Sequence, residues 1–336
     1  MDAAAALKVL FLGTGSFAEP AFDALLQSRN AVVGLVTQPD RGGPGRHHHE
    51  PPLKAAAVAA GLPVLQPENI NAPESLDRLR EFTADLYVVA AYGQMLKRDL
   101  LSIPRYGAVN LHASLLPRHR GAAPVHYAIL SGDAETGVTV FQIERRLDAG
   151  PILGMVRTAI GPRETTGDLE PRLARLAAEL ILDVADRIAA GTATPVPQDD
   201  AFATLAPRMP KSFGEIDWTR TSAEIERKVR ALQPWPKAYS FLQAGEGPPL
   251  RLTLLDVAPL PGFAADAQPG EVIASGPGEL RIRTGDGALA VERLQPAGKR
   301  DMVIAEFLRG RAVPPGSRFC GDRASTSKPS GERDSE

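Results

Sequence analysis

The first part of the chain alternates apolar strands with helices, and this order limits the folds that it can adopt. The stretch DLYVVAA (85–91) is apolar without interruption, as expected of a strand that is covered on both faces of its sheet. A long amphipathic helix is predicted over 167–190 and ends at Gly191. Further strands are predicted at 8–12, 31–37, 64–65, 107–112, 136–143 and 151–160. This order predicts an α/β domain over 1–190 with a Rossmann-like, mainly parallel sheet.

The second part of the chain has a different character. Residues 191–213 are irregular and rich in proline, which is typical of a linker. After a helix at 222–232, short strands are expected at 237–243, 250–256, 270–274, 279–283 and 288–293. Closely spaced short strands favour a small β-barrel, expected to be OB-like and to span 214–320. The polar tail, 321–336, lacks large apolar residues and is predicted to be disordered.

Charge, cysteine content and hydropathy narrow the class of protein. The formal net charge of −2 gives no global field for nucleic acid, so such a partner must meet a local patch. Cys320 is the single cysteine, which rules out an internal disulfide and favours a reducing, cytoplasmic location. No apolar run reaches membrane-spanning length, so no membrane partner is expected.

The stretch AVNLHASLLPRHRGAAP (108–124) holds the strongest candidates for chemistry. Asn110 and His112 lie two residues apart, so on a strand they point to the same side. Strand ends of an open α/β sheet are where ligands bind. An amide can donate to a developing oxyanion, and an imidazole can exchange a proton near neutral pH. Asp148, in the turn LDAGP between two predicted strands, is the carboxylate that could assist them.

These residue types point to direct acyl transfer through a tetrahedral intermediate, since no Ser or Cys nucleophile stands beside a base. The simpler interpretation is that all three are ordinary polar groups at a strand end and in a turn, and an isolated N-x-H would favour it. A dinucleotide site is a further alternative, because Gly13, Gly15 and Ala18 follow the first strand. Thr37-Gln38-Pro39 stands where the ribose-binding acid belongs, so a turn without NAD is preferred.

A family resemblance strengthens the interpretation that Asn110, His112 and Asp148 carry out acyl transfer. NLHASLLPRHRGAAP and GDAETGVTVFQIERRLDAGPIL (132–153) closely resemble the folate-dependent formyltransferases, whose pattern is N-x-H before S-L-L-P and a later D-x-G. The resemblance covers nearly the whole chain except the tail. The segments IDW, PWP and QPAGKR are similar to the members that act on tRNA. The resemblance therefore implies formyl transfer from 10-formyltetrahydrofolate to the amino group of methionyl-initiator tRNA. A monomer is expected, and no metal is expected because no Cys/His set has ligand spacing.

The resemblance also assigns roles to individual residues. It implies that Asn110, His112 and Asp148 are catalytic, in a domain spanning 1–190, and that the barrel domain binds tRNA. Folate contacts are expected from Ser114, Leu115, Leu116 and Pro117, and from Tyr92 and Gly93. Contacts to tRNA are implied in the same way for Arg41 and Arg46, which match the family's basic loop. Lys211, Lys299 and Arg300 are expected to contact tRNA for a different reason, because they are cations of the mildly basic C-terminal region.

The loop at 38–50 departs from the family pattern. It has His47, His48 and His49 where lysines are usual, and neutral histidines attract phosphate less at pH 7. Adjacent histidines diverge, so a metal site is not predicted there. A formyltransferase for a nucleotide-sugar amine and a folate- or RNA-binding module without catalysis remain alternatives. A formyl-transfer assay would distinguish a binding module without catalysis from an enzyme.

Overall fold

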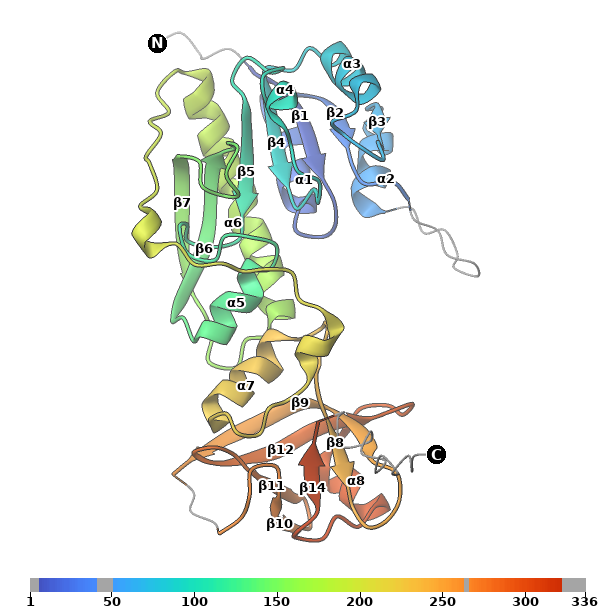
Figure 1. The fold of residues 1–336 in the computed structure, drawn as a ribbon. Coiled ribbons are helices and arrows are strands. Elements are labelled where there is room, and N and C mark those ends of the chain that lie inside the picture. Colours follow the sequence, from blue (N-terminus) through green and yellow to red (C-terminus); the bar gives the residue numbers. More distant parts are fainter. Residues whose placement is uncertain (1–5, 41–50, 263–265, 322–336) are drawn as a thin grey trace, which may run out of the picture. The chain divides into compact units, whose positions relative to one another are not determined.

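The computed structural model describes residues 6–40, 51–262 and 266–321, which form two compact units (Figure 1). The first unit comprises residues 1–128, 133–162 and 167–208. The second comprises residues 129–132, 163–166 and 209–336. Residues 191–208 therefore belong to the first unit, and 209–213 to the second.

A seven-stranded sheet with the order β3-β2-β1-β4-β5-β6-β7 forms the centre of the first unit. Its strands are β1 (Lys8–Gly13), β2 (Ala31–Val36), β3 (Val64–Leu65), β4 (Leu86–Ala90), β5 (Ala108–His112), β6 (Glu135–Gln142) and β7 (Ile152–Ala159). The first five strands pair in parallel, whereas β5–β6 and β6–β7 are antiparallel. The antiparallel β6–β7 pairing follows from the short connection between these two strands, which leaves no room for a crossover helix.

Helices connect most of these strands. They are α1 (Glu19–Leu26), α2 (Pro52–Ala59), α3 (Pro73–Glu81), α4 (Arg98–Leu101), α5 (Pro124–Ser131) and α6 (Thr166–Ala189). Proline stands in the first turn of α1, α2 and α3, where its missing N–H is not needed. Every residue of β4 is buried, as the uninterrupted apolar run predicts for a covered strand.

The second unit is built on a curled antiparallel sheet. Its elements are η2 (Lys211–Gly214), α7 (Ser222–Ala231), β8 (Ala238–Gln243), β9 (Leu250–Pro261), β10 (Val272–Gly276), β11 (Glu279–Arg283), β12 (Gly287–Pro296), β13 (Met302–Val303), α8 (Ile304–Gly310) and β14 (Arg318–Cys320). The strand order is β10-β11-β12-β9-β8-β14. The sheet curls until its ends meet, because a bridge joins Glu271 to Arg318 and the Phe319 N–H donates to the Gly270 carbonyl (2.7 Å).

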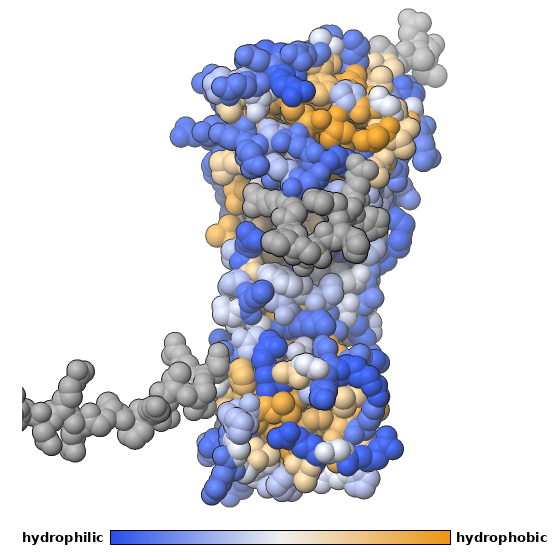
Figure 2. All heavy atoms as spheres, turned by 90° about the vertical axis from the view of Figure 1, so that its right-hand side faces the viewer, coloured by the Kyte–Doolittle hydropathy of each residue, from blue (hydrophilic) through white to orange (hydrophobic). Residues whose placement is uncertain are grey.

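The predicted Rossmann-like sheet and the C-terminal barrel are both confirmed. The face in Figure 2 is mostly hydrophilic, with apolar residues in limited patches. Within the described ranges, no helix combines the length and apolar character that crossing a membrane requires. The predicted disorder of the tail falls on residues 322–336, which lie outside the described part of the chain.

Candidate active site

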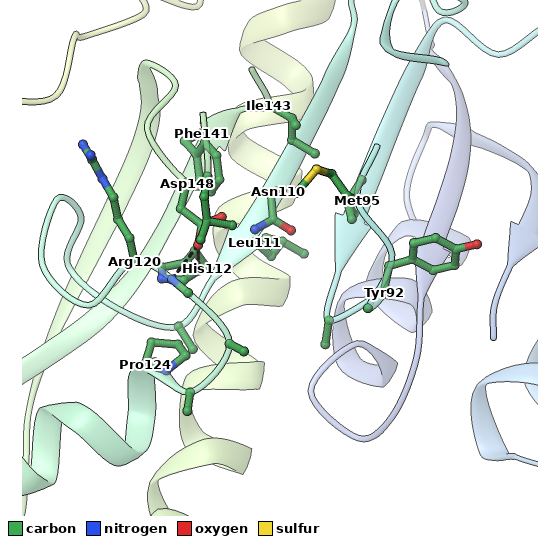
Figure 3. A pocket seen from close by; sticks show the side chains of 18 of the residues that line it. Tyr92, Met95, Asn110, Leu111, His112, Arg120, Pro124, Phe141, Ile143 and Asp148 are labelled. Carbon is green, nitrogen blue, oxygen red and sulfur yellow. Dashed lines mark hydrogen bonds and ion pairs between the residues drawn. The ribbon is translucent and has the colours of Figure 1, made fainter. Parts of the chain in front are cut away.

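The candidate site is a cavity of about 720 Å³ in the first unit, at the carboxyl ends of β4 and β5 (Figure 3). The strand order reverses between β1 and β4, and open α/β sheets bind ligands at such a reversal. β5 lies between the parallel β4 and the antiparallel β6, so loops from both neighbours reach the same edge. Asn110, His112 and Asp148 all line this cavity.

Asn110 presents an amide that the fold does not use. It lies opposite Phe141 in the β5–β6 pair, is partly buried, and faces the cavity together with His112. Its side chain hydrogen-bonds no other residue in the described part of the chain. The N–H groups of this amide can therefore bind an oxyanion without breaking a contact of the fold.

His112 is buried and held at one ring nitrogen. Its Nε2 lies 2.9 Å from the His119 carbonyl oxygen, which can only accept, so Nε2 carries the proton. In the neutral ring, Nδ1 is then the unprotonated nitrogen, and it lies 3.8 Å from Asp148 Oδ2. Burial lowers the pKa of His112, and the Asp148 charge and the bond to His119 oppose this effect. The resulting neutral imidazole can accept a proton at Nδ1.

Asp148 lies in the loop between β6 and β7 in an unusual conformation. Its φ of 47° is in the left-handed region, which non-glycine residues rarely adopt. Its Oδ2 accepts a hydrogen bond from the Gly121 N–H (2.7 Å), and its side chain is only 13% exposed. Ala91 and His119, which line or support the same cavity, also have positive φ. Such conformations concentrate at functional sites.

The loop after β4 forms an apolar side of the cavity. Tyr92, Gly93 and Met95 line it, with Phe141 and Ile143 on β6 and just after it. The ring of Tyr92 and its buried hydroxyl point away from His112 and Asp148 (Figure 3). This surface can accept a flat heterocycle.

The four residues expected beside folate, Ser114 to Pro117, do not line this cavity. Ser114 is fully buried, and its hydroxyl donates to the Arg118 carbonyl (2.7 Å). The Leu116 N–H donates to the Thr139 hydroxyl (3.2 Å), and Leu116 is 3% exposed. The segment forms a corner that leads into residues 118–121, with Ser114 and Leu116 buried and Leu115 and Pro117 partly buried.

Two residues that line the cavity, Glu170 and Arg120, were not singled out as site residues from the sequence. Glu170, on α6, lines the cavity near Phe17, and burial raises the pKa of its carboxyl group. Arg120 is 8% exposed, and its guanidinium bonds Gln198 and Asp200. Arg120 was visible in the motif, but a Glu on an amphipathic helix carries no sequence signal for a cavity.

The residues expected to contact tRNA do not gather in this cavity. Lys211, Lys299 and Arg300 are exposed on the second unit, and Arg300 forms an ion pair with Glu306. Arg41 and Arg46 lie outside the described residues, as do His47, His48 and His49. Across the described ranges, no three His, Cys, Asp or Glu side chains are grouped as metal ligands would be.

Comparison with known proteins adds independent information. Residues 7–185 match the family model described as formyl transferase, and residues 208–312 match the formyl transferase C-terminal domain. A methionyl-tRNA formyltransferase of Halorhodospira halophila is 44% identical over 312 residues, which are 93% of this chain and 98% of the relative. One of Citrifermentans bemidjiense is 41% identical over 311 residues, covering 92% and 95%.

The fold also resembles solved structures. The N-formyltransferase of Helicobacter canadensis, solved with folinic acid and dTDP-3-aminofucose, superimposes with a TM-score of 0.63 at 16% identity. The match covers 85% of this chain and 98% of that one. At this identity the likeness concerns the fold alone.

Proposed function

Because this chain belongs to the formyl transferase family, we propose that it transfers the formyl group of 10-formyltetrahydrofolate to the amino group of methionyl-initiator tRNA. The relatives that match more than nine-tenths of the chain are named for this reaction. The observation that carries the proposal is the convergence of Asn110, His112 and Asp148 on one cavity in such a chain. A monomer suits this role, since all three residues come from a single chain. A cytoplasmic location is proposed because the relatives are named for a tRNA substrate.

The geometry supports a specific division of roles. Asn110 donates to the oxyanion that forms when the neutral amine attacks the formyl carbon. His112 Nδ1 takes a proton from the attacking nitrogen, and Asp148 stabilises the imidazolium from 3.8 Å. His112 then returns this proton to N10 of the departing folate as the C–N10 bond breaks. The amine has lost one proton and N10 has gained one, so the reaction balances without a covalent enzyme intermediate.

The donor is proposed to occupy the apolar side formed by Tyr92, Gly93, Met95, Phe141 and Ile143. Its formyl group would then lie near Asn110 and His112. Ser114 to Pro117 are proposed to act indirectly, by fixing the corner beneath the site.

The tRNA is proposed to contact cations of residues 38–50 and of the second unit. Lys211 and Lys299 are exposed and suited to phosphate, and Arg41 and Arg46 are the candidates in the loop. Arg41→Ala should raise KM for tRNA and leave KM for the folate unchanged.

The deciding experiment supplies purified protein with 10-formyltetrahydrofolate and charged initiator tRNA and scores formyl-methionine. Parallel reactions replace the tRNA by free methionine or by a nucleotide-linked amino sugar. Formylation of the tRNA alone is expected. Formylation of the sugar alone, or of nothing while folate still binds, would refute the proposal.

A further inference from the structure

We propose that residues 196–206 form a strap that positions the catalytic loop, with Gln198 as its central positioning residue. This inference rests on the proposed function, because it assigns Gln198 a role in holding Asp148 for proton transfer. The strap leads out of the long helix α6 and includes η1 (Asp200–Phe202). Its Val196 forms an antiparallel bridge with Ile152, the first residue of β7.

Gln198 uses its whole hydrogen-bonding capacity beside the catalytic loop. Its Nε2 donates to the carbonyl oxygens of Asp148 (2.9 Å) and Gly150 (2.8 Å). Its Oε1 accepts from Nε (3.1 Å) and Nη2 (2.7 Å) of Arg120. Arg120 is in turn held by Asp200, whose Oδ1 lies 2.8 Å from Nη2. Gln198 is partly buried, and an amide with every donor and acceptor paired fixes its neighbours in one arrangement.

The Asp148 loop needs such a support. A non-glycine residue in the left-handed region costs roughly 1 kcal/mol or more, so neighbouring contacts must hold it there. Gly150 also approaches β6 so closely that a Cβ atom would lie 1.8 Å from the Gln142 carbonyl oxygen. Gln198 bonds the main chain on both sides of this turn and thereby sets where the Asp148 carboxylate stands.

The strap holds the His112 side of the site as well. The Arg120 N–H donates to the Thr204 carbonyl (2.8 Å), and the Ala206 N–H donates to the Arg120 carbonyl (2.7 Å). The Thr204 hydroxyl accepts from the His119 N–H (2.8 Å). His119 is the residue whose carbonyl binds His112 Nε2. One segment therefore orients both the imidazole and the carboxylate.

The test compares Gln198→Ala and Gln198→Glu with a matched control. Gln233 is also partly buried, and its Nε2 also donates to two carbonyls, those of Val229 (3.0 Å) and Leu255 (2.8 Å), in the second unit. Both Gln198 variants should lower kcat about 10- to 100-fold, because small misplacements of catalytic groups cost this much. KM for both substrates should stay within about twofold, as the cavity walls are retained. Gln233→Ala should lose similar thermal stability but keep kcat within about twofold.

A double-mutant cycle separates positioning from general destabilisation. If Gln198 acts through Asp148, Gln198→Ala should change the rate of Asp148→Asn by less than about threefold. Gln198→Glu keeps an oxygen for Arg120 and removes the two donors, so it tests the loop contact even if Gln198→Ala folds poorly. Wild-type kcat in Gln198→Glu, or full additivity with Asp148→Asn, would overturn the proposal. A failure of the proposed function itself would differ, since wild-type protein would then formylate no tRNA.

Discussion

Replacing Asp148 by Asn isolates the charge of the catalytic carboxylate. The side chains of His112 and Asp148 are 6% and 13% exposed and 3.8 Å apart, so bulk water screens them incompletely. With an effective dielectric of about 20, an imidazolium and a carboxylate at this distance attract by about 4 kcal/mol. If the transition state contains the protonated ring, this attraction corresponds to about a thousandfold in rate.

The fold should tolerate this substitution. An Asn oxygen can still accept the Gly121 N–H, which Asp148 Oδ2 binds at 2.7 Å. We therefore expect the free energy of unfolding to change by less than about 1 kcal/mol in thermal denaturation. Asp186→Asn is the charge-matched control, since it removes a half-exposed carboxylate that pairs with Arg29 on the surface.

The assay measures kcat/KM for tRNA formylation from pH 5 to pH 8. Burial lowers the pKa of His112, so the wild-type rate should fall only at pH below the ordinary histidine range, as the ring loses its ability to accept a proton. Asp148→Asn removes the charge that raises this pKa, so its fall should come at still lower pH. A rate within tenfold of wild type, or an unchanged pH profile, would refute the role of Asp148.

Three further variants test separate parts of the structure. Asn110→Ala should lower kcat/KM about 10²- to 10³-fold with an unchanged melting temperature, because its amide bonds nothing in the described fold; a loss of stability would contradict this. Gly150→Ala should reduce kcat by shifting the Asp148 loop, since its Cβ would collide with the Gln142 carbonyl; kinetics and calorimetry together report it. Thr221→Ala breaks the capping box with Glu224 and should destabilise the protein by about 1 kcal/mol in denaturant titration, at unchanged kcat.

Much of the fold followed from the sequence because the signals were strong and local. The apolar run of β4 predicted a strand covered on both faces. The short turn between β6 and β7 allowed only antiparallel pairing of these two strands. β9 runs to Pro261, beyond the predicted end at 256, and includes Pro259 and Pro261. Beyond Leu254 this strand no longer pairs with β8, and proline is tolerated where one side of a strand is unpaired.

The candidate site was predictable only in part. Two-residue spacing placed Asn110 and His112 on one face of β5, and the short turn placed Asp148 beside the same sheet. The segment Ser114–Pro117 was expected to face folate, but apolar residues at a strand end look alike whether they line a cavity or a core. Gln198 lies in a polar, proline-rich segment, and such composition does not reveal what the segment packs against.

The closure of the second unit has a consequence for how the chain folds during synthesis. The Ser240 hydroxyl on β8 donates to the Cys320 carbonyl, 80 residues further along the chain (2.9 Å). Until that last strand has been made, β8 and the start of β10 each present an unpaired edge, and such edges attract other strands. Pairing over such a separation is also intrinsically slow. The nascent chain therefore keeps two unpaired strand edges until β14 (Arg318–Cys320) leaves the ribosome. During this interval the edges can pair with strands of other chains, which would lead to misassembly.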